Sequence, residues 1–202
     1  NLDMVNLVKE IYHSPHNLLD ADLVFNALHG GDGENGTIQA YLDLHHISYT
    51  GSGSKASKIA MDKNISKLIA QSVKIPTPKW VLFKRDSYTG LKLQNHETFK
   101  FTYPYVVKPS NEGSTYGLSI VYDASELPEA IDLAAEYSDE ILIEEYIPGR
   151  ELTVGILGEK SLPIVEIIPS HDLYDFECKY TEGMSKYLVP AALSDSLVRK
   201  IS

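Results

Sequence analysis

The chain has 202 residues, of which 43% are hydrophobic and 23% charged, enough for a folded core in one or two domains and unlike a disordered chain. A formal net charge of −10 argues against a nucleic-acid-binding protein, because an acidic surface repels phosphate backbones. No apolar run approaches the ~20 residues of a membrane span, and no secretory leader is visible. The single cysteine, Cys178, fits a reducing compartment, so we expect a cytoplasmic protein that does not contact a membrane.

The first quarter of the chain has the order strand, loop, helix, strand. Its hydropathy pattern predicts a buried strand over 21–28, a helix over 37–45 and a short strand over 47–49. The glycine-rich segment 30–36 joins the first strand to the helix. This order is typical of the end of an α/β unit, and the glycine and serine run 50–54 predicts a domain boundary.

The remainder of the chain mixes strands and helices. Helices are predicted over 55–60 and 62–71, before the prolines of the segment Ile75–Pro78. Ser125 is a plausible N-cap for a further helix, whose apolar face carries Leu127, Ala130, Ile131 and Ala134. Residues 84–100 have weak periodicity and predict a loop with some helix. Strands are predicted over 80–83, 105–107, 118–121, 140–145, 152–157 and 163–168.

The segment Lys108–Gly117 has a composition suited to phosphate binding. A predicted strand delivers Lys108, and a loop of small residues follows it. Glycines let backbone N–H groups approach phosphate oxygens, while hydroxyls add donors and a lysine adds positive charge. The segment is not a Walker A loop, which ends in Gly-Lys-Ser/Thr before a helix. Taken alone, these residues fit a surface hairpin with an incidental lysine equally well.

A second polar group follows the apolar strand Ile141–Ile143. Glu144 and Glu145 end this strand, and Glu151 comes after a turn. Carboxylates in such places can accept hydrogen bonds from an adenine amino group or from ribose hydroxyls. Solvated acids at a strand edge are the more common interpretation when this segment is taken by itself.

Seven sequence blocks add an ordered pattern to these two segments. They are His29–Gln39, Tyr49–Gly53, Met61–Lys63, Ile75–Pro78, Lys108–Gly117, Leu162–Ile167 and Tyr174–Tyr180. In this order they resemble the D-alanine–D-alanine ligases of the ATP-grasp superfamily over nearly the whole chain. Each block alone is weak evidence, but chance matches do not preserve order, so the seven together are specific.

The resemblance implies an α+β fold of the ATP-grasp type. Residues 1–53 would be the remainder of an N-terminal α/β (pre-ATP-grasp) domain that holds substrate. Residues 54–144 would form the central lobe, and residues 145–202 the start of a truncated C-terminal lobe. ATP would lie between these two lobes.

The resemblance also assigns ATP-binding roles to lysines and glutamates spread along the chain. These fall to Lys63 and Lys108 for the phosphates, Glu144 for the adenine amino group, Glu145 and Ile147 for the adenine edge through their backbone, and Glu151 for the ribose. Without the shared order, Lys63 is equally well an ordinary solvated helix lysine.

Catalytic and substrate-binding roles follow from the same resemblance. The Gly113–Thr115 loop would close over the phosphates, with Ser114 also near the substrate. Lys179 and Tyr180 would belong to a mobile loop that closes on the phosphates and the second substrate. His29 and Gly30 would lie in the substrate site. Taken singly, Lys179 fits an ordinary surface position, His29 fits a helix cap and Tyr180 fits a half-buried core position.

The implied reaction joins two D-alanines through an acyl phosphate, consuming ATP with Mg²⁺ or Mn²⁺, to give D-alanyl-D-alanine for peptidoglycan synthesis. The small-molecule partners would be D-alanine and ATP, and the family is commonly dimeric. Tyr180 favours an amine over a hydroxyl as the acceptor. Tyr116 departs from the small aliphatic residue usual there, so loop closure is expected to differ.

The two ends of the pattern are missing. The start at Asn1 is not typical of a native N-terminus, and the family's N-terminal glycine-rich turn with its glutamate is absent. The family's metal ligands, an aspartate and a Glu-x-Asn pair, would come after Ser202, so no metal ligand can be named in this chain. We therefore expect a fragment that is inactive or nearly so by itself.

Three alternatives remain open. Another ATP-grasp ligase, such as an L-amino-acid ligase or a biotin carboxylase relative, would keep Lys63, Lys108 and Glu144 but lack the His29 block and the Lys179–Tyr180 loop. A noncatalytic nucleotide-binding module fits the missing metal segment but has no need of a closing loop. A structural protein without a ligand would leave the lysines unexplained.

Overall fold

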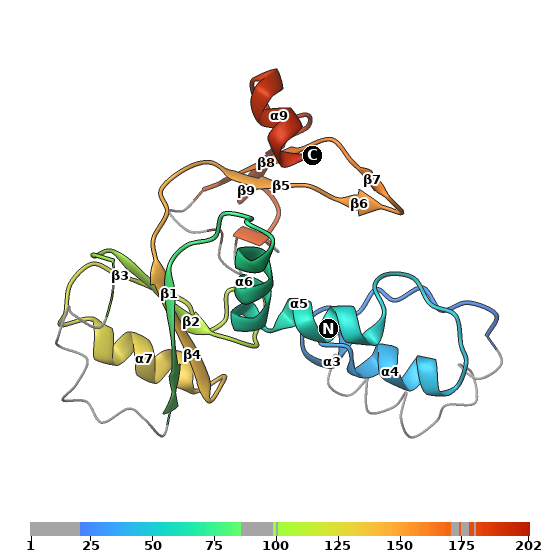
Figure 1. The fold of residues 1–202 in the computed structure, drawn as a ribbon, viewed down its shortest axis with the longest axis horizontal. Coiled ribbons are helices and arrows are strands. Elements are labelled where there is room, and N and C mark those ends of the chain that lie inside the picture. Colours follow the sequence, from blue (N-terminus) through green and yellow to red (C-terminus); the bar gives the residue numbers. More distant parts are fainter. Residues whose placement is uncertain (1–20, 86–98, 100, 171–173, 175–177, 180) are drawn as a thin grey trace. The chain divides into compact units, whose positions relative to one another are not determined.

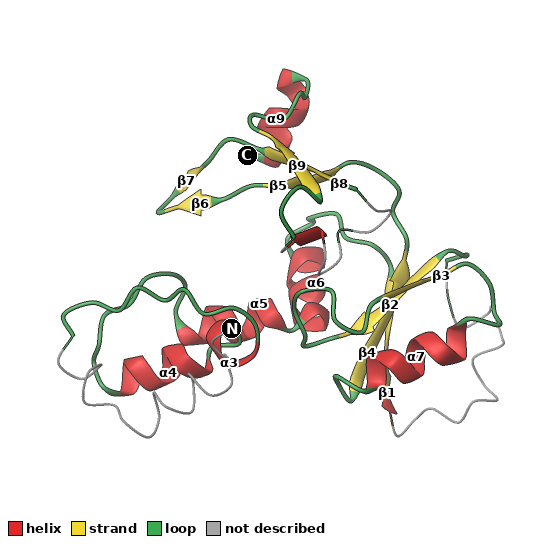
Figure 2. Ribbon diagram, turned by 180° about the vertical axis from the view of Figure 1, so that it is seen from behind, coloured by secondary structure: helices red, strands yellow, loops and turns green. Residues whose placement is uncertain are grey.

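The computed structural model describes residues 21–85, 99, 101–170, 174, 178–179 and 181–202. These residues form two compact units, Asn1–Tyr146 and Ile147–Ser202, which are described separately below. Helices and strands occur in both units (Figure 1, and from behind in Figure 2). Within the described ranges, no helix has both the length and the apolar character needed to cross a membrane.

The first segment packs around the helix α4 (Thr37–Leu44). Ile38 and Leu42 of this helix form a small core with Ile47. The strand predicted over 21–28 is wrong in extent, because Val24 makes only a single parallel bridge with Tyr49. Alternation is nevertheless present: Val24 faces the small core, whereas Leu23 and Phe25 are 60% and 79% exposed. A continuous strand needs a continuous ladder partner, and the described neighbour supplies one residue pair.

The predicted glycine-rich loop contains a short helix, α3 (Gly31–Glu34). Gly30 precedes it with a φ of +69°, a conformation that costs glycine little. Gly33 is buried, and a Cβ at this position would lie 2.5 Å from the Cβ of Leu28. Glycine is therefore required here for close packing of the turn against the preceding segment.

Two helices lead from this segment to the sheet, α5 (Ser54–Met61) and α6 (Lys63–Ser72), which confirms the predicted helices. Asp62 separates them in extended conformation. Its carboxylate accepts a hydrogen bond from the backbone N–H of Ile65 at 3.0 Å. This N-cap contributes about 1 kcal/mol and fixes the position where α6 begins.

A four-stranded antiparallel sheet follows, with the strand order β1-β4-β2-β3. Its strands are β1 (Trp80–Lys84), β2 (Tyr105–Pro109), β3 (Ser119–Val121) and β4 (Glu140–Glu145), as predicted within a few residues. One face packs against α7 (Leu127–Ala135). Ser125 is not the cap of this helix, because its N–H and hydroxyl both bond to the Asp123 carboxylate in a local turn.

The second unit contains a three-stranded antiparallel sheet, a two-stranded hairpin and a terminal helix. The strand predicted over 152–157 is two strands, and Gly155 interrupts them by accepting a hydrogen bond from the N–H of Leu162 at 2.8 Å. The elements of this unit are β5 (Glu151–Thr153), β8 (Val165–Pro169) and β9 (Ser185–Leu188) in the sheet, β6 (Ile156–Leu157) and β7 (Lys160–Ser161) in the hairpin, and α9 (Asp195–Ile201).

Candidate functional site

The two faces of the four-stranded sheet carry different chemistry. Alternate residues of β2 and β4 point to opposite faces, as strand geometry requires. Val107 and Ile143 are fully buried in the core formed with α7. Lys108 and Glu144 occupy the opposite face, where the register pairs Lys108 with Leu142. Lys108 and Glu144 are therefore diagonal neighbours on a charged face.

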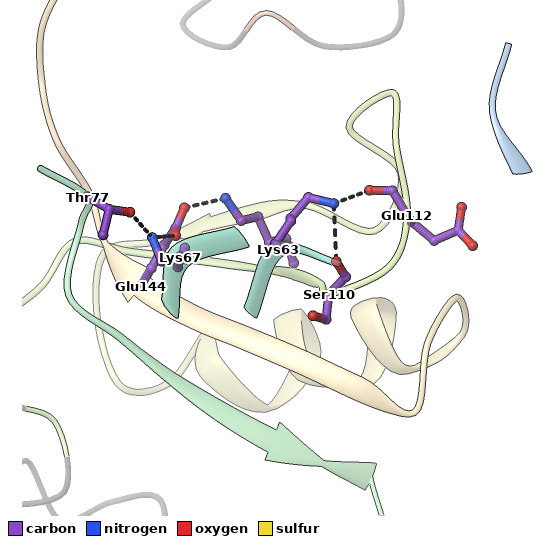
Figure 3. Close-up of polar contacts among 7 residues, drawn as sticks. Lys63, Lys67, Thr77, Ser110, Glu112 and Glu144 are labelled. Atoms are coloured by element: carbon purple, nitrogen blue, oxygen red, sulfur yellow. Dashed lines mark hydrogen bonds and ion pairs between the residues drawn. The ribbon is translucent and has the colours of Figure 1, made fainter. Parts of the chain in front are cut away.

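Glu144 is the centre of a buried ion network. Its side chain is 8% exposed and is in contact with two ammonium groups. Lys67 of α6 donates to Oε2 at 2.7 Å, and Lys108 donates to Oε1. Figure 3 shows Lys67 directed from α6 toward Glu144 and Thr77. One carboxylate thus receives two cations, which leaves a net positive charge in a poorly solvated place.

Lys67 is held by two further contacts. Its ammonium donates to the Thr77 hydroxyl at 3.0 Å and lies 5.1 Å from the centre of the Trp80 ring. Burial lowers the pKa of Lys67, and the hydrogen bond and charge of Glu144 partly oppose this effect. The sequence analysis did not single out Lys67 or Thr77. A signal existed, because Lys63 and Lys67 are four residues apart and share one face of α6.

Lys63 adds a third cation at the start of α6. Its ammonium donates to the backbone carbonyls of Ser110, at 3.4 Å, and Glu112 (Figure 3). Burial lowers the pKa of Lys63, and the positive charge of Lys108 lowers it further. The two ammonium groups therefore repel each other beside the 110–117 loop, and an anion placed between them would remove that repulsion.

The 110–117 loop returns the chain from β2 to β3. Ser114 and Thr115 adopt left-handed backbone conformations, with φ of 52° and 66°. Such conformations cost a non-glycine residue about 1–2 kcal/mol, so the surroundings hold the turn in place. The ring of Tyr116 stacks on Tyr137 with 5.9 Å between the ring centres, at the C-terminal end of α7.

The glycine-rich segment of the first unit lies next to this loop. A Cβ added to Gly113 would be 3.4 Å from a carboxylate oxygen of Glu34 in α3. His29 is exposed just before this helix, and Gly30 caps it. A cavity of about 880 Å³ borders both segments; its lining includes Asn35, Thr37, Lys58, Asp62, Asn111 and Glu112. The structure therefore brings the predicted substrate segment close to the predicted phosphate loop.

The backbone hydrogen bonds at the end of β4 limit which groups there could bind the edge of an adenine ring. The N–H of Glu145 already donates to the carbonyl of Lys79 at 2.9 Å, which leaves its carbonyl oxygen as the group to accept a hydrogen bond. Ile147 begins the second unit and is 59% exposed.

Glu151 and Lys179 interact electrostatically within the second unit. Partial burial raises the pKa of the Glu151 carboxyl, and the charge of Lys179 opposes that rise. The Lys179 ammonium also lies 5.3 Å from the centre of the Tyr174 ring. Tyr180, the neighbouring candidate, lies outside the described residues.

Sequence reasoning missed a second charged pair in this unit. Arg150 donates from Nε to Glu166 at 2.6 Å and contacts the same carboxylate through Nη2, while Nη1 donates to the carbonyl of Ala192 at 3.0 Å. The hydrogen bonds and charge of Arg150 hold the pKa of Glu166 below its usual value. This two-point contact joins the start of β5 to β8 and to the segment before α9, so it braces the unit.

The implied chemistry needs a divalent metal, which carboxylate oxygens would hold. Within the described ranges, no three His, Cys, Asp or Glu side chains gather as a metal site. The described residues thus supply cations for a polyanion but no carboxylate cluster for Mg²⁺.

Comparisons with known proteins identify the family of this chain. Residues 5–52 match the family model described as D-ala D-ala ligase N-terminus, and residues 69–202 match the model described as D-ala D-ala ligase C-terminus. A D-alanine–D-alanine ligase of Halalkalibacterium halodurans is 46% identical over 181 residues, which cover 88% of this chain and 58% of that protein.

Solved structures of the Bacillus anthracis D-alanine–D-alanine ligase have the same fold. One superimposes with a TM-score of 0.80 at 36% identity, covering 94% of this chain and 61% of that chain. Another, solved as a complex with ATP, superimposes with a TM-score of 0.75 at 33% identity, covering 100% of this chain and 61% of that chain. The chain thus spans about three fifths of these relatives and has the ATP-grasp fold expected from its sequence. It belongs to the D-alanine–D-alanine ligase family.

Proposed function

We propose that this chain carries most of the nucleotide-binding machinery of an ATP-dependent ligase that joins two D-alanines. The observation that supports this proposal most strongly is the charged face on which Lys67 and Lys108 contact Glu144, while Lys63 binds backbone carbonyls of the neighbouring 110–117 loop. Two ammonium groups on one carboxylate, with a third on the adjacent loop, favour binding of a polyanion. The solved relative in complex with ATP supports the choice of that polyanion.

The chemistry requires an activated carboxylate, because an amine cannot expel oxide from a carboxylate. The γ-phosphoryl group of ATP moves to a carboxylate oxygen of the first D-alanine, giving an acyl phosphate and ADP. The amine of the second D-alanine then attacks the carbonyl carbon and loses a proton, and phosphate leaves as the amide forms. Lys63 and Lys108 would neutralise the phosphate oxygens, where negative charge concentrates during transfer.

The other candidates would position the two substrates. The Glu144 carboxylate would accept a hydrogen bond from the adenine amino group, and the Glu151 carboxylate would bind the ribose hydroxyls. Ser114 and the backbone of its loop would cover the phosphates, excluding the water that would hydrolyse the acyl phosphate. His29 and Gly30 would lie at the amino-acid site, and Lys179 and Tyr180 would close over it. The ligase would act in the cytoplasm, supplying D-alanyl-D-alanine for peptidoglycan, with Mg²⁺ and as a homodimer.

Two measurements test this function separately. Calorimetric titration of the 202-residue chain with ATP tests the nucleotide site, and we expect saturable binding with a preference over GTP. A chimera, in which the chain replaces the matching 181 residues of the Halalkalibacterium halodurans ligase, tests the chemistry. ADP release dependent on D-alanine, with D-alanyl-D-alanine identified by mass spectrometry, is the expected result.

The outcomes separate the alternatives. ATP binding by the chain, together with a folded chimera that makes no D-alanyl-D-alanine, would favour a noncatalytic nucleotide-binding module. No ATP binding by the chain would remove the basis of the proposal. Replacing the second D-alanine by D-lactate in the chimera tests the acceptor, and amide formation is expected to exceed ester formation.

A further inference from the structure

We propose that the two lysines on Glu144 have different parts: Lys67 holds the carboxylate permanently, whereas Lys108 leaves it for the phosphates and so frees an oxygen to read adenine. The inference rests on the proposed nucleotide site and deepens it. It makes Lys67 a positioning residue, and it couples recognition of the base to recognition of the phosphates.

The first support is the unequal anchoring of the two ammonium groups. Lys67 has the Thr77 hydroxyl, the Trp80 ring and Glu144 as partners, and its side chain is 10% exposed. In the part of the chain that the structure describes, Glu144 is the only hydrogen-bond partner recorded for the Lys108 ammonium, and the side chain is 19% exposed. Moving Lys108 therefore breaks one contact, whereas moving Lys67 breaks three.

The second support is that the two lysines use different oxygens of the carboxylate. Lys67 bonds to Oε2 and Lys108 to Oε1. Departure of Lys108 would leave Oε1 available to accept an N–H from an amino group, while Lys67 keeps the carboxylate charged and in place. Without a remaining cation, a carboxylate this buried would be strongly disfavoured in its charged form.

The third support is the position of Lys63. Its ammonium donates to the backbone carbonyls of Ser110 and Glu112 at the start of the 110–117 loop, and the charge of the nearby Lys108 lowers the pKa of Lys63. A phosphate chain in this place would attract both cations. Lys108 would then exchange one anionic partner for another, so its charge stays paired throughout.

The exchange predicts that removal of Lys108 strengthens adenosine binding, whereas removal of Lys67 weakens it. Lys108→Met vacates Oε1 in advance, so adenosine, which lacks phosphates, should bind about threefold more tightly while ATP binds at least about tenfold more weakly. Lys67→Met leaves Lys108 as the sole partner of Glu144, so adenosine and ATP should both bind about tenfold more weakly. A merely structural role for both lysines would weaken binding in both variants.

The experiment is a titration of the 202-residue chain and its variants with adenosine and ATP, followed by the fluorescence of Trp80. This residue is the one tryptophan of the chain and lies beside Lys67. Lys67→Arg should restore both affinities to within about threefold of the original chain. The matched control is Lys84→Met, which breaks an exposed lysine–glutamate pair of 3.6 Å with Glu140 and should change neither affinity.

The results separate this inference from the proposed function. If the original chain does not bind ATP, the nucleotide site itself is refuted. If it binds ATP but Lys108→Met leaves adenosine binding unchanged or weaker, the nucleotide site stands and the exchange is wrong. Should Lys67→Met fail to fold, Thr77→Val replaces it. Removing that hydroxyl should weaken adenosine and ATP binding by about threefold, and unchanged affinities would refute the anchoring role of Lys67.

Discussion

The two faces of the four-stranded sheet are built from alternate residues of the same strands, yet they serve different ends. On one face Tyr105, Val107 and Ile143 are fully buried in an apolar core formed with α7. On the other face, the charged side chains of Glu144 and Lys108 are 8% and 19% exposed. The comparison teaches that burial alone does not mark a structural core. Burial of unequal charge marks a place prepared for a ligand.

The largest effect is expected from a substitution on the apolar face, and it is a loss of folding stability. Ile143→Ala should destabilise the chain by about 2–5 kcal/mol, because the side chain is fully buried and its removal leaves a cavity. Urea unfolding measures this loss, and the preference for ATP over GTP should persist in the folded fraction. Leu133→Ala, at a 39% exposed position of α7, is the control and should lose under about 1 kcal/mol.

The next largest effect is expected from a substitution on the charged face, and it is a loss of ATP affinity. Lys63→Met should weaken ATP binding by about 10- to 100-fold, since it removes a cation from the phosphate region. Stability in urea should be unchanged or higher, because burial of Lys63 disfavours its charged form. Calorimetry compares this variant with Lys84→Met, at an exposed lysine of β1. Full ATP affinity in Lys63→Met would place the nucleotide elsewhere.

A pH series sharpens the same comparison. The pKa of Lys63 lies below its usual 10.5 in the free chain, and bound phosphate should raise it again. A proton is then taken up on binding, so ATP affinity should fall as pH rises through the lowered pKa, by up to about tenfold per pH unit. Calorimetry in alkaline buffers should show this fall in the original chain and a weaker fall in Lys63→Arg, whose guanidinium stays charged.

The smallest expected effect on stability comes from an exposed lysine–glutamate pair, Lys84 and Glu140. Lys84→Met breaks the 3.6 Å pair with Glu140, whose lysine side chain is 69% exposed. Solvent screens such pairs, so the loss of stability should be at most about 0.5 kcal/mol. Thermal unfolding measures it. A loss as large as that of Ile143→Ala would remove the distinction between exposed and buried pairs on which the comparison depends.

Local patterns in the sequence predicted most of the helices and strands of the first unit. Apolar periodicity located α4, α5, α6 and β4, because each has a face or run long enough to be recognised. Prediction was poorer where an element depends on its neighbours. The segment 21–28 alternates like a strand but pairs at a single residue, and β6 and β7 are only two residues each.

The sequence by itself determined the family, the ATP-grasp fold and the residues Lys63, Lys108 and Glu144 as candidates, since ordered blocks and residue types are local properties of the chain. Only the tertiary structure decided that Lys108 contacts Glu144, that Lys63 binds the adjacent loop, that Lys67 and Thr77 complete the network, and that Arg150 contacts Glu166. Lys67 is 77 residues from Glu144 along the chain. Which distant charge reaches a buried carboxylate depends on helix placement and strand register, which no local pattern specifies.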